Sequence, residues 1–429
     1  LSAQKTPKIK IGSLVAFVLG ALICIEINFI GIFNLNEIIC LTAAPLILLV
    51  NTKKIRTGIN RKILIYALGW LLMQIFTDVY RSTPSADSLR GWGNISLFVS
   101  NFCVIYALCY RNMLRCFYFV LGILCSQIID YFIAPNMYVV TEPWKFGFGT
   151  WINMVMFFVF GSILASSKDR IVFFVICVLV FFLIALNFYL GSRNLGLIIF
   201  LSFVVFLWSE KMLKKAVKIK RLNKLKLKNY VGMLSVLMLG CLAAYFSYSY
   251  FAESGILGDA AQTKFETQSS GSMGILLGGR QEILVSSLAI YDSPIIGHGS
   301  WPRDSQYSDL ISGLLSDLGY DVPAIIFTGE MDGLIPTHSY LIGAWVYSGM
   351  LGALFWFYIL SINIKSMMQS FNLKSPYKLF ILYSVIGLFW DILFSPLGLY
   401  SRTYAALMLV IVLSSKEIEN RNKLVEHRF

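Results

Sequence analysis

His338 is the residue of this chain best suited to moving a proton near neutral pH, because imidazole side chains titrate there and the chain has three histidines. It stands in 335-IPTHSYLIGAWVYSGMLG-352, between a proline and a long apolar run. Thr337 or Ser339 would cap the following helix as well as a histidine would. His338 is therefore the candidate base, with backbone capping as the alternative. His298, in a Gly-His-Gly turn, is either a second candidate or a loop residue.

Two arginines have surroundings that suit phosphate binding. Arg193, in 187-NFYLGSRNLGL-197, stands at a tight turn between apolar runs, and Arg280, in 278-GGRQEIL-284, opens an expected helix. A guanidinium is a planar, permanently charged fork that matches phosphate oxygens, and a helix N-terminus adds to the attraction. The weaker candidates for substrate contact are Arg90, Arg303, Arg402 and Tyr340. Such arginines can instead pair with an acid or reach lipid headgroups.

The composition predicts the scaffold that must position these side chains. Hydrophobic residues make up 57% of the 429 residues, charged residues make up 14%, and the mean hydropathy is +0.71, outside the range of soluble globular proteins. A helix needs roughly 20 apolar residues to cross a membrane. We therefore expect an all-α polytopic integral membrane protein with about twelve transmembrane helices, at 12–33, 36–50, 62–79, 93–110, 114–134, 151–167, 169–190, 194–209, 230–252, 339–364, 377–395 and 402–415.

The positions of lysine and arginine predict the orientation, because these residues favour the cytoplasmic side in short loops. With the N-terminus inside, the basic connections at 53–62, 111–115 and 210–229 also fall inside, as does the C-terminal tail. Both termini are therefore expected to be cytoplasmic. The net charge of +13 is then a property of the inner face, so we do not infer nucleic-acid binding. The basic run 211–228 is expected to lie on the membrane surface as a helix.

The chain divides into nine spans in 1–252, a large outer loop in 253–338, and three spans with a tail in 339–429. A structureless loop of that length would be unusual, so we expect a folded cap. Within it, 309–320 has apolar residues at helical spacing, and a second helix is expected from Gly279 to Tyr291. The loop carries eleven acidic and three basic residues. With no Cys-x-x-Cys and no paired histidines, neither a metal site nor any other cofactor is expected.

Taken in order, these motifs resemble the O-antigen polymerase and ligase superfamily, the Wzy and WaaL type membrane glycosyltransferases. The resemblance rests on 192-SR-193, 279-GR-280, 293-SPIIGHG-299 and 338-HSYLIGAWVYSGMLG-352, and it covers roughly Gly191 to Trp356. The rest of the chain matches in span number and topology alone. Two departures are Ser339, where the family often has asparagine, and the pair Ile283 and Leu284, where it often has an aromatic residue. Neither departure removes a proposed chemical group.

The resemblance implies a GT-C-like fold and an inverting, metal-independent glycosyl transfer on the periplasmic face of the bacterial inner membrane. The donor would be an oligosaccharide on undecaprenyl pyrophosphate, held by Arg193 and Arg280 through its pyrophosphate. His338 would act as base toward the acceptor hydroxyl. A Wzy-type polymerase, which builds O-antigen or capsular polysaccharide, would take a second lipid-linked repeat as acceptor. Membrane lipids and a regulator of chain length are the further partners implied.

Two other functions stay open at this point. A ligase would differ in its acceptor alone, the lipid A core of lipopolysaccharide, which is rich in phosphate and suits an acidic outer loop poorly. The polymerase is therefore favoured. A flippase or transporter of lipid-linked glycan would have a similar number of spans, but it should show two related halves. The chain instead has one large loop placed asymmetrically.

Overall fold

The computed structural model describes residues 10–50, 58–133, 135, 137–218, 227–272, 274, 282–320, 333–371 and 373–426. Among these residues, seven helical segments are long and apolar enough to cross a membrane. They belong to α4 (Gly58–Tyr80), α5 (Ser85–Cys109), α6 (Met113–Ile133), η2 with α8 (Pro143–Phe148 and Gly149–Ser166), α9 (Arg170–Tyr189), α10 (Arg193–Lys218) and α16 (Tyr340–Ser370). These segments are those of a predominantly α-helical, membrane-embedded protein. The expected number of about twelve spans stays a prediction.

The first expected span, 12–33, is wrong as a single helix. Helix α1 (Ile11–Ala21) and the short η1 (Leu22–Cys24) are followed by an antiparallel hairpin, β1 (Glu26–Asn28) with β2 (Ile32–Asn34), before α2 (Leu35–Val50) begins. The segment after Cys24 is rich in isoleucine, which favours strands, and Gly31 lies in the turn. Apolar content alone did not separate this hairpin from a helix.

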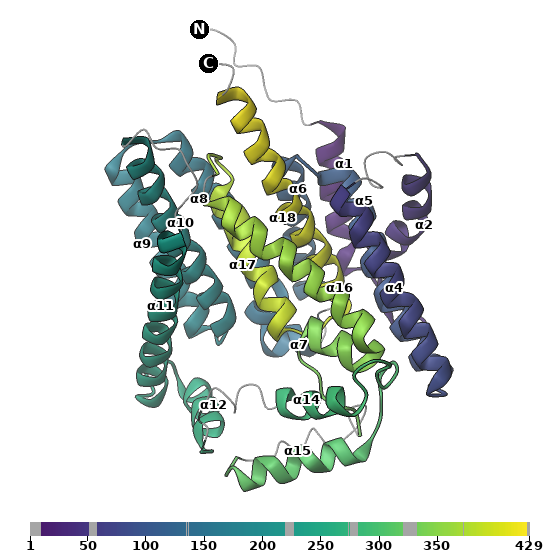
Figure 1. Cartoon of the computed structure of the whole chain (residues 1–429). Coiled ribbons are helices and arrows are strands. Elements are labelled where there is room, and N and C mark those ends of the chain that lie inside the picture. Colours follow the sequence, from purple (N-terminus) through teal and green to yellow (C-terminus); the bar gives the residue numbers. More distant parts are fainter. Residues whose placement is uncertain are drawn as a thin grey trace.

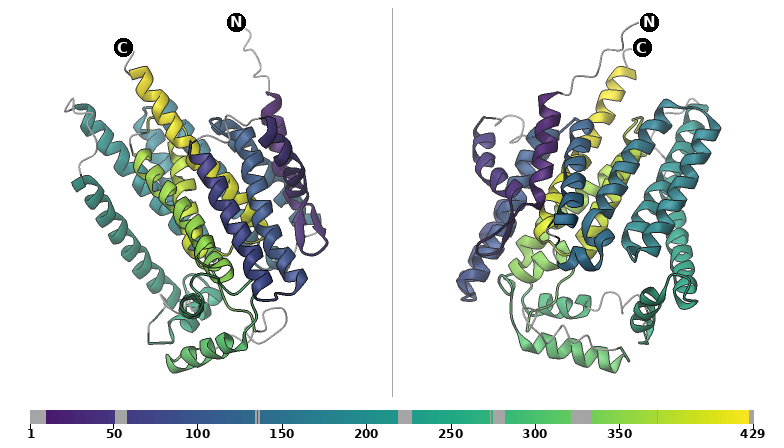
Figure 2. Two further views of the ribbon diagram at one scale, coloured as in Figure 1. Left: turned by 45° about the vertical axis from the view of Figure 1, so that its right-hand side comes forward. Right: turned by 180° about the vertical axis from the view of Figure 1, so that it is seen from behind.

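The helices run along a common direction, and both ends of the chain lie at one end of the bundle (Figures 1 and 2). The remaining long helices are α11 (Leu227–Glu253), α17 (Lys378–Phe394) and α18 (Leu399–Glu426). The expected surface helix at 211–228 is corrected here. The run continues α10 as far as Lys218, α11 begins at Leu227, and 219–226 lie outside the described residues. Lysine and leucine propagate a helix well, so nothing in 211–218 ends it.

Aromatic side chains pack α4 and α5 against α16 in the interior of the bundle. Trp70 stacks on Phe355 with ring centroids 5.1 Å apart, and Phe98 meets Trp356 at 5.6 Å. All four rings are buried. Because lipid is as apolar as these side chains, such helices associate through close packing and internal hydrogen bonds. The packing fixes α4 and α5 against the middle of α16, the helix that follows His338.

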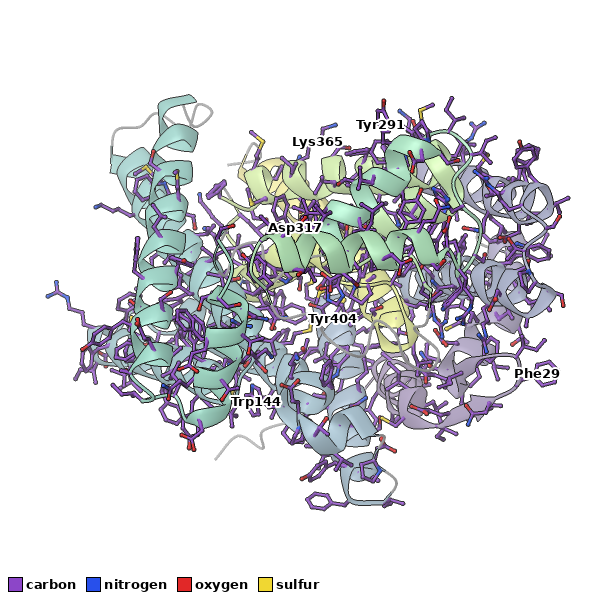
Figure 3. The ribbon with its side chains drawn as sticks, turned by 90° about the horizontal axis from the view of Figure 1, so that it is seen from below. Phe29, Trp144, Tyr291, Asp317, Lys365 and Tyr404 are labelled. Carbon is purple, nitrogen blue, oxygen red and sulfur yellow. The ribbon has the colours of Figure 1, made fainter. Side chains whose placement is uncertain are left out.

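The segment between α11 and α16 forms a cap at the end of the bundle away from the termini (Figure 1). Its helices are α12 (Asp259–Ser269), α14 (Glu282–Asp292) and α15 (Ser305–Asp317), and Figure 3 shows Tyr291 and Asp317 on the last two of these across the bundle end. A small core joins α14 and α15 to α16, made of Val285, Ala289, Tyr307, Ile311, Leu315, Tyr320, Ile335 and Val346. Both expected cap helices are confirmed, except that 275–281 lie outside the described residues.

A break in α16 ties the cap to the bundle. The helix is non-helical at Ser348 and at Gly349, whose φ is +62°. Near this break, the carbonyl of Val346 accepts from the His298 N–H at 2.7 Å, and that of Tyr347 accepts from the Gly299 N–H at 3.0 Å. The Met350 N–H donates in return to the Ile295 carbonyl at 3.1 Å. The segment 295–299 thus replaces the hydrogen bonds that the helix loses, and we call it the clasp.

Gly349→Ala should unfold the clasp. A Cβ there would overlap the Ile295 carbonyl, and the backbone is in the left-handed region, so we expect a loss of about 2–4 kcal/mol in the free energy of unfolding. Thermal unfolding of the purified protein in detergent measures it. The matched control is Gly313→Ala on α15, where a Cβ meets nothing within 4 Å and a helical alanine is favourable. Equal melting temperatures for the two variants would contradict the structural role of the clasp.

Candidate functional site

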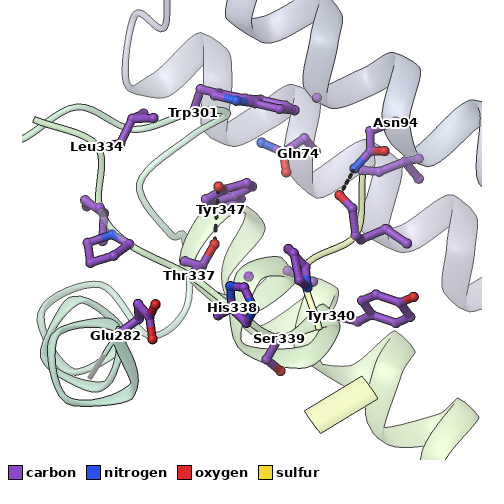
Figure 4. A pocket seen from close by; sticks show the side chains of 18 of the residues that line it. Gln74, Asn94, Glu282, Trp301, Leu334, Thr337, His338, Ser339, Tyr340 and Tyr347 are labelled. Atoms are coloured by element: carbon purple, nitrogen blue, oxygen red, sulfur yellow. Dashed lines mark hydrogen bonds between the residues drawn. The ribbon is translucent and has the colours of Figure 1, made fainter. Parts of the chain in front are cut away.

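A cavity of about 400 Å³ lies between the cap and those ends of α4, α5 and α16 that are remote from the chain termini (Figures 1 and 4). Its lining is aromatic and aliphatic, interrupted by a few polar side chains, which is typical of a small-molecule or glycan site. The polar residues of the lining are Gln74, Asn94, Glu282, Thr337, His338 and Ser339. The aromatic residues are Trp70, Trp301, Tyr340 and Tyr347.

His338 is half-buried and its imidazole lines the cavity, as Figure 4 shows. The residue that caps the N-terminus of α16 is the neighbouring Ser339. Its Oγ accepts from the Ile342 N–H at 3.1 Å and donates to the Ile392 carbonyl at 2.8 Å. On the other side, Thr337 Oγ1 donates to the Tyr347 hydroxyl at 3.3 Å. Since Ser339 performs the capping, that alternative role of His338 is not needed.

Glu282 is a residue of this cavity that we did not single out from the sequence. It begins α14, and one turn later the buried Ser286 Oγ lies 2.7 Å from the Glu282 carbonyl and 2.5 Å from the Pro336 carbonyl. This bond holds the first turn of α14 against the segment that leads into His338. From the sequence, Glu282 is marked only by its place near a helix start, because the bond that holds α14 beside the cavity joins Ser286 to Pro336, 50 positions apart.

A buried carboxylate, Asp78 on α4, holds the end of the clasp. Its Oδ1 accepts from the Ser300 N–H at 2.6 Å, and its Oδ2 accepts from Ser300 Oγ at 2.8 Å and from Trp92 Nε1 at 2.8 Å. Gln74 Nε2 also donates to Ser300 Oγ at 2.9 Å. Gly91 leaves room for Ser300, because a Cβ there would overlap that hydroxyl. Asp78 therefore fixes the backbone that enters the cavity at Trp301.

His298 has a structural position. Its Nε2 lies 2.7 Å from the Ala289 carbonyl on α14, and its ring meets Tyr307 edge-to-face at 5.7 Å. Burial and the hydrogen bond to Asp292 raise the pKa of Tyr307, so this phenol stays protonated at neutral pH. The motif 293-SPIIGHG-299 thus joins the cap to the bundle, and His298 does not line the cavity.

The weaker arginine candidates are engaged elsewhere. Arg402 is buried and makes a bidentate pair with Glu37, at 2.8 and 2.7 Å, while its Nη1 donates to Asn94 at 3.3 Å. Arg90 pairs with Asp87 at 3.3 Å. Arg303 forms an antiparallel bridge with Leu334 through its backbone. None of the three lines the cavity, although Arg402 supports its wall through Asn94.

Arg193 lies in a separate cationic cluster at the same end of the molecule. Its guanidinium donates to the Tyr248 hydroxyl at 3.2 Å and to Gln268 Oε1 at 2.9 Å, which joins α10 to α11 and α12. Burial, and then the charges of Lys145 and Arg193, lower the pKa of Lys264 on α12. Within the described residues, Glu142 is the acid that pairs with both lysines, at 2.6 Å from Lys145 and 4.0 Å from Lys264.

Lys145 and Lys264 share the Glu142 carboxylate, and Arg193 adds a third positive charge near Lys264, so this cationic cluster could attract an anion. Ser192, next to Arg193, is fully buried, and its hydroxyl has no hydrogen-bond partner among the described atoms. Arg280, the other expected phosphate ligand, lies outside the described residues. Tyr340 is buried, lines the cavity and packs on Trp356 at 4.9 Å. Among the described residues, no group of three or more His, Cys, Asp or Glu side chains could hold a metal ion.

No protein-family model matches this chain, and no curated protein matches it significantly.

Asp78→Asn should loosen the clasp, because an amide presents an NH₂ group to at least one of the donors that surround Asp78. We expect a loss of about 2 kcal/mol in the free energy of unfolding and faster tryptic cleavage after the exposed Arg303, measured by limited proteolysis. Asp317→Asn, at the exposed end of α15, is the matched control. If both variants were cleaved at the wild-type rate, Asp78 would not hold the cap.

Proposed function

We propose that this protein is a membrane glycosyltransferase of the O-antigen polymerase type. It joins oligosaccharide repeats carried on undecaprenyl pyrophosphate into O-antigen or capsular polysaccharide, on the periplasmic face of the bacterial inner membrane. His338 acts as base, and Arg193 and Arg280 bind the pyrophosphate. The observation that carries the proposal is the imidazole of His338 in an aromatic cavity, at the membrane end that also bears the cationic cluster.

The chemistry needs a base and an anion site. The acceptor hydroxyl attacks the anomeric carbon of the donor glycan, and His338 takes the hydroxyl proton as the new C–O bond forms. The bond between the anomeric carbon and the pyrophosphate oxygen breaks, and its electron pair leaves with the pyrophosphate. Attack from the face opposite the leaving group inverts the anomeric centre. Positive side chains stabilise the charge that develops on this weakly basic leaving group.

The cationic cluster supports the second half of this reaction. Arg193 presents a guanidinium fork, and Lys264 and Lys145 add two ammonium groups close to it. Burial is the main cause of the lowered pKa of Lys264, and repulsion from Lys145 and Arg193 adds to it. A pyrophosphate would relieve that repulsion. The excess of acids over bases in 253–338, eleven against three, favours an acceptor without many phosphates, and hence a polymerase over a ligase.

His338→Ala should abolish glycan transfer by the purified protein, by a factor of at least about 100, and leave the melting temperature close to wild type. Transfer by wild type should also fall on acidification, because a protonated imidazole cannot accept a proton. Gel separation of the elongated glycan measures both. The control is His298→Ala, which should lower the melting temperature through the lost Ala289 contact yet keep transfer per folded molecule. Near-wild-type transfer by His338→Ala would remove the base from the proposal.

Inorganic pyrophosphate should raise the melting temperature of wild type, and it should do so much less for Lys264→Gln. The control is Lys168→Gln, an exposed lysine at the opposite end of the bundle. Because the folded pKa of Lys264 lies below its unfolded value of 10.5, the charged lysine disfavours the fold, and this penalty lessens as the pH rises through the folded pKa. Over the same pH range Lys264 loses its positive charge and so its attraction for pyrophosphate. The stabilisation by pyrophosphate should therefore decrease as the pH rises through the folded pKa of Lys264. Equal stabilisation of all three proteins would contradict the anion site.

A further inference from the structure

Trp301 has a backbone conformation that is unfavourable for two separate reasons. Its φ is +47°, in the left-handed region, which bulky side chains rarely adopt. It also precedes Pro302, and a residue before proline prefers an extended conformation. Such conformations persist where the surroundings impose them, and they gather at functional sites. Contacts around Trp301 must therefore offset this backbone strain.

The surroundings hold Trp301 from both sides. Before it, Ser300 is fully buried and is fixed by Asp78 through both its N–H and its hydroxyl. After it, the Pro302 carbonyl accepts from the Ile335 N–H at 3.0 Å, and the Asp304 N–H donates to the Gly333 carbonyl at 2.7 Å. These bonds join 302–304 to the segment that leads to His338. The conformation of Trp301 is thus imposed by contacts on the bundle and on the cap.

The result is that the indole lines the same cavity as His338. In Figure 4 the ring of Trp301 lies at one end of the cavity, with Tyr347 between it and His338. The Trp301 and Tyr347 ring centroids are 6.0 Å apart and the planes are inclined by 36°. Gln74, Asn94, Glu282 and Thr337 supply amide, carboxylate and hydroxyl groups around the same space.

An aromatic face beside hydrogen-bonding side chains matches the chemistry of a sugar ring. A pyranose presents axial C–H groups on one face, which pack on an aromatic ring, and hydroxyls at its edge that donate and accept hydrogen bonds. A prenyl chain would bury the Glu282 carboxylate of the lining against apolar groups, whereas the hydroxyls of a sugar can donate hydrogen bonds to it. The lining therefore favours the glycan over its lipid carrier as the occupant of this end of the cavity.

We propose that Trp301 is the platform on which a sugar ring of the glycan stacks, placing a neighbouring hydroxyl or anomeric carbon near His338. This assignment rests on the proposed glycan transfer for its ligand class. The sugar belongs to the acceptor or to the donor glycan, and both present the same ring chemistry. Trp301 contributes binding and positioning and takes no part in the proton transfer.

The test is binding of free oligosaccharide to the purified full-length protein in detergent. The probe is the water-soluble repeat that mild acid releases from the lipid-linked glycan of the source cells. Trp301→Asn removes the indole and suits the left-handed backbone, so it should fold like wild type and bind about tenfold more weakly. Trp301→Phe keeps a stacking ring and should bind within about threefold of wild type. Trp208→Phe, on α10 and outside the cavity lining, should bind like wild type.

Isothermal titration calorimetry gives the dissociation constants, and thermal unfolding shows that each variant is folded. Wild-type affinity in Trp301→Asn overturns the proposal, and so does the absence of saturable binding to the wild-type protein. Extension of the free oligosaccharide identifies the acceptor as the source of the ring, whereas inhibition of elongation without extension identifies the donor. Binding that depends on Trp301, in a protein that transfers no glycan, would uphold the platform and reject the glycosyltransferase.

Discussion

The cavity depends on one exchange of backbone hydrogen bonds, between the break in α16 and the clasp 295–299. An unpaired backbone group in a membrane costs several kcal/mol, so α16 can break at Ser348 and Gly349 because the clasp supplies the missing partners. The exchange fastens the cap to α16 at Ser348 and Gly349, within the part of the helix nearest the cap. Asp78 extends the attachment to Ser300, and the chain then enters the cavity at Trp301.

The proposed reaction uses two separate sets of side chains at this end of the bundle. The cavity holds His338 with Trp301 and Glu282, all set by the clasp or by α14. The cationic cluster is carried by α10, α12 and the segment before α8, and Arg193 is not part of the cavity lining. The proposed glycan transfer therefore requires a donor that reaches from the cluster to the cavity, with its sugars toward His338.

Local features were predictable from the sequence, and long-range ones were not. The spacing of Ile311 and Leu315 predicted the amphipathic α15, and both are buried, although Leu310 is 43% exposed. Ser339 was recognised as a possible N-cap because capping is a local interaction. The hairpin after Cys24 was missed because short apolar strands and helices share a composition. Asp78 bonds to Ser300, 222 residues away, and the bond that holds the first turn of α14 joins Ser286 to Pro336, 50 residues away. No local pattern encodes such contacts.

The proposed glycosyl transfer is tested most directly by elongation of a lipid-linked single repeat by the purified protein in vesicles, without added metal. We expect a ladder of longer glycans on the carrier, with pyrophosphate-linked lipid released at each step. We also expect the ladder to be lost in His338→Ala while the protein stays folded. Transfer of the single repeat to lipid A core, or movement of the unchanged lipid across the vesicle membrane with no ladder, would contradict the proposal.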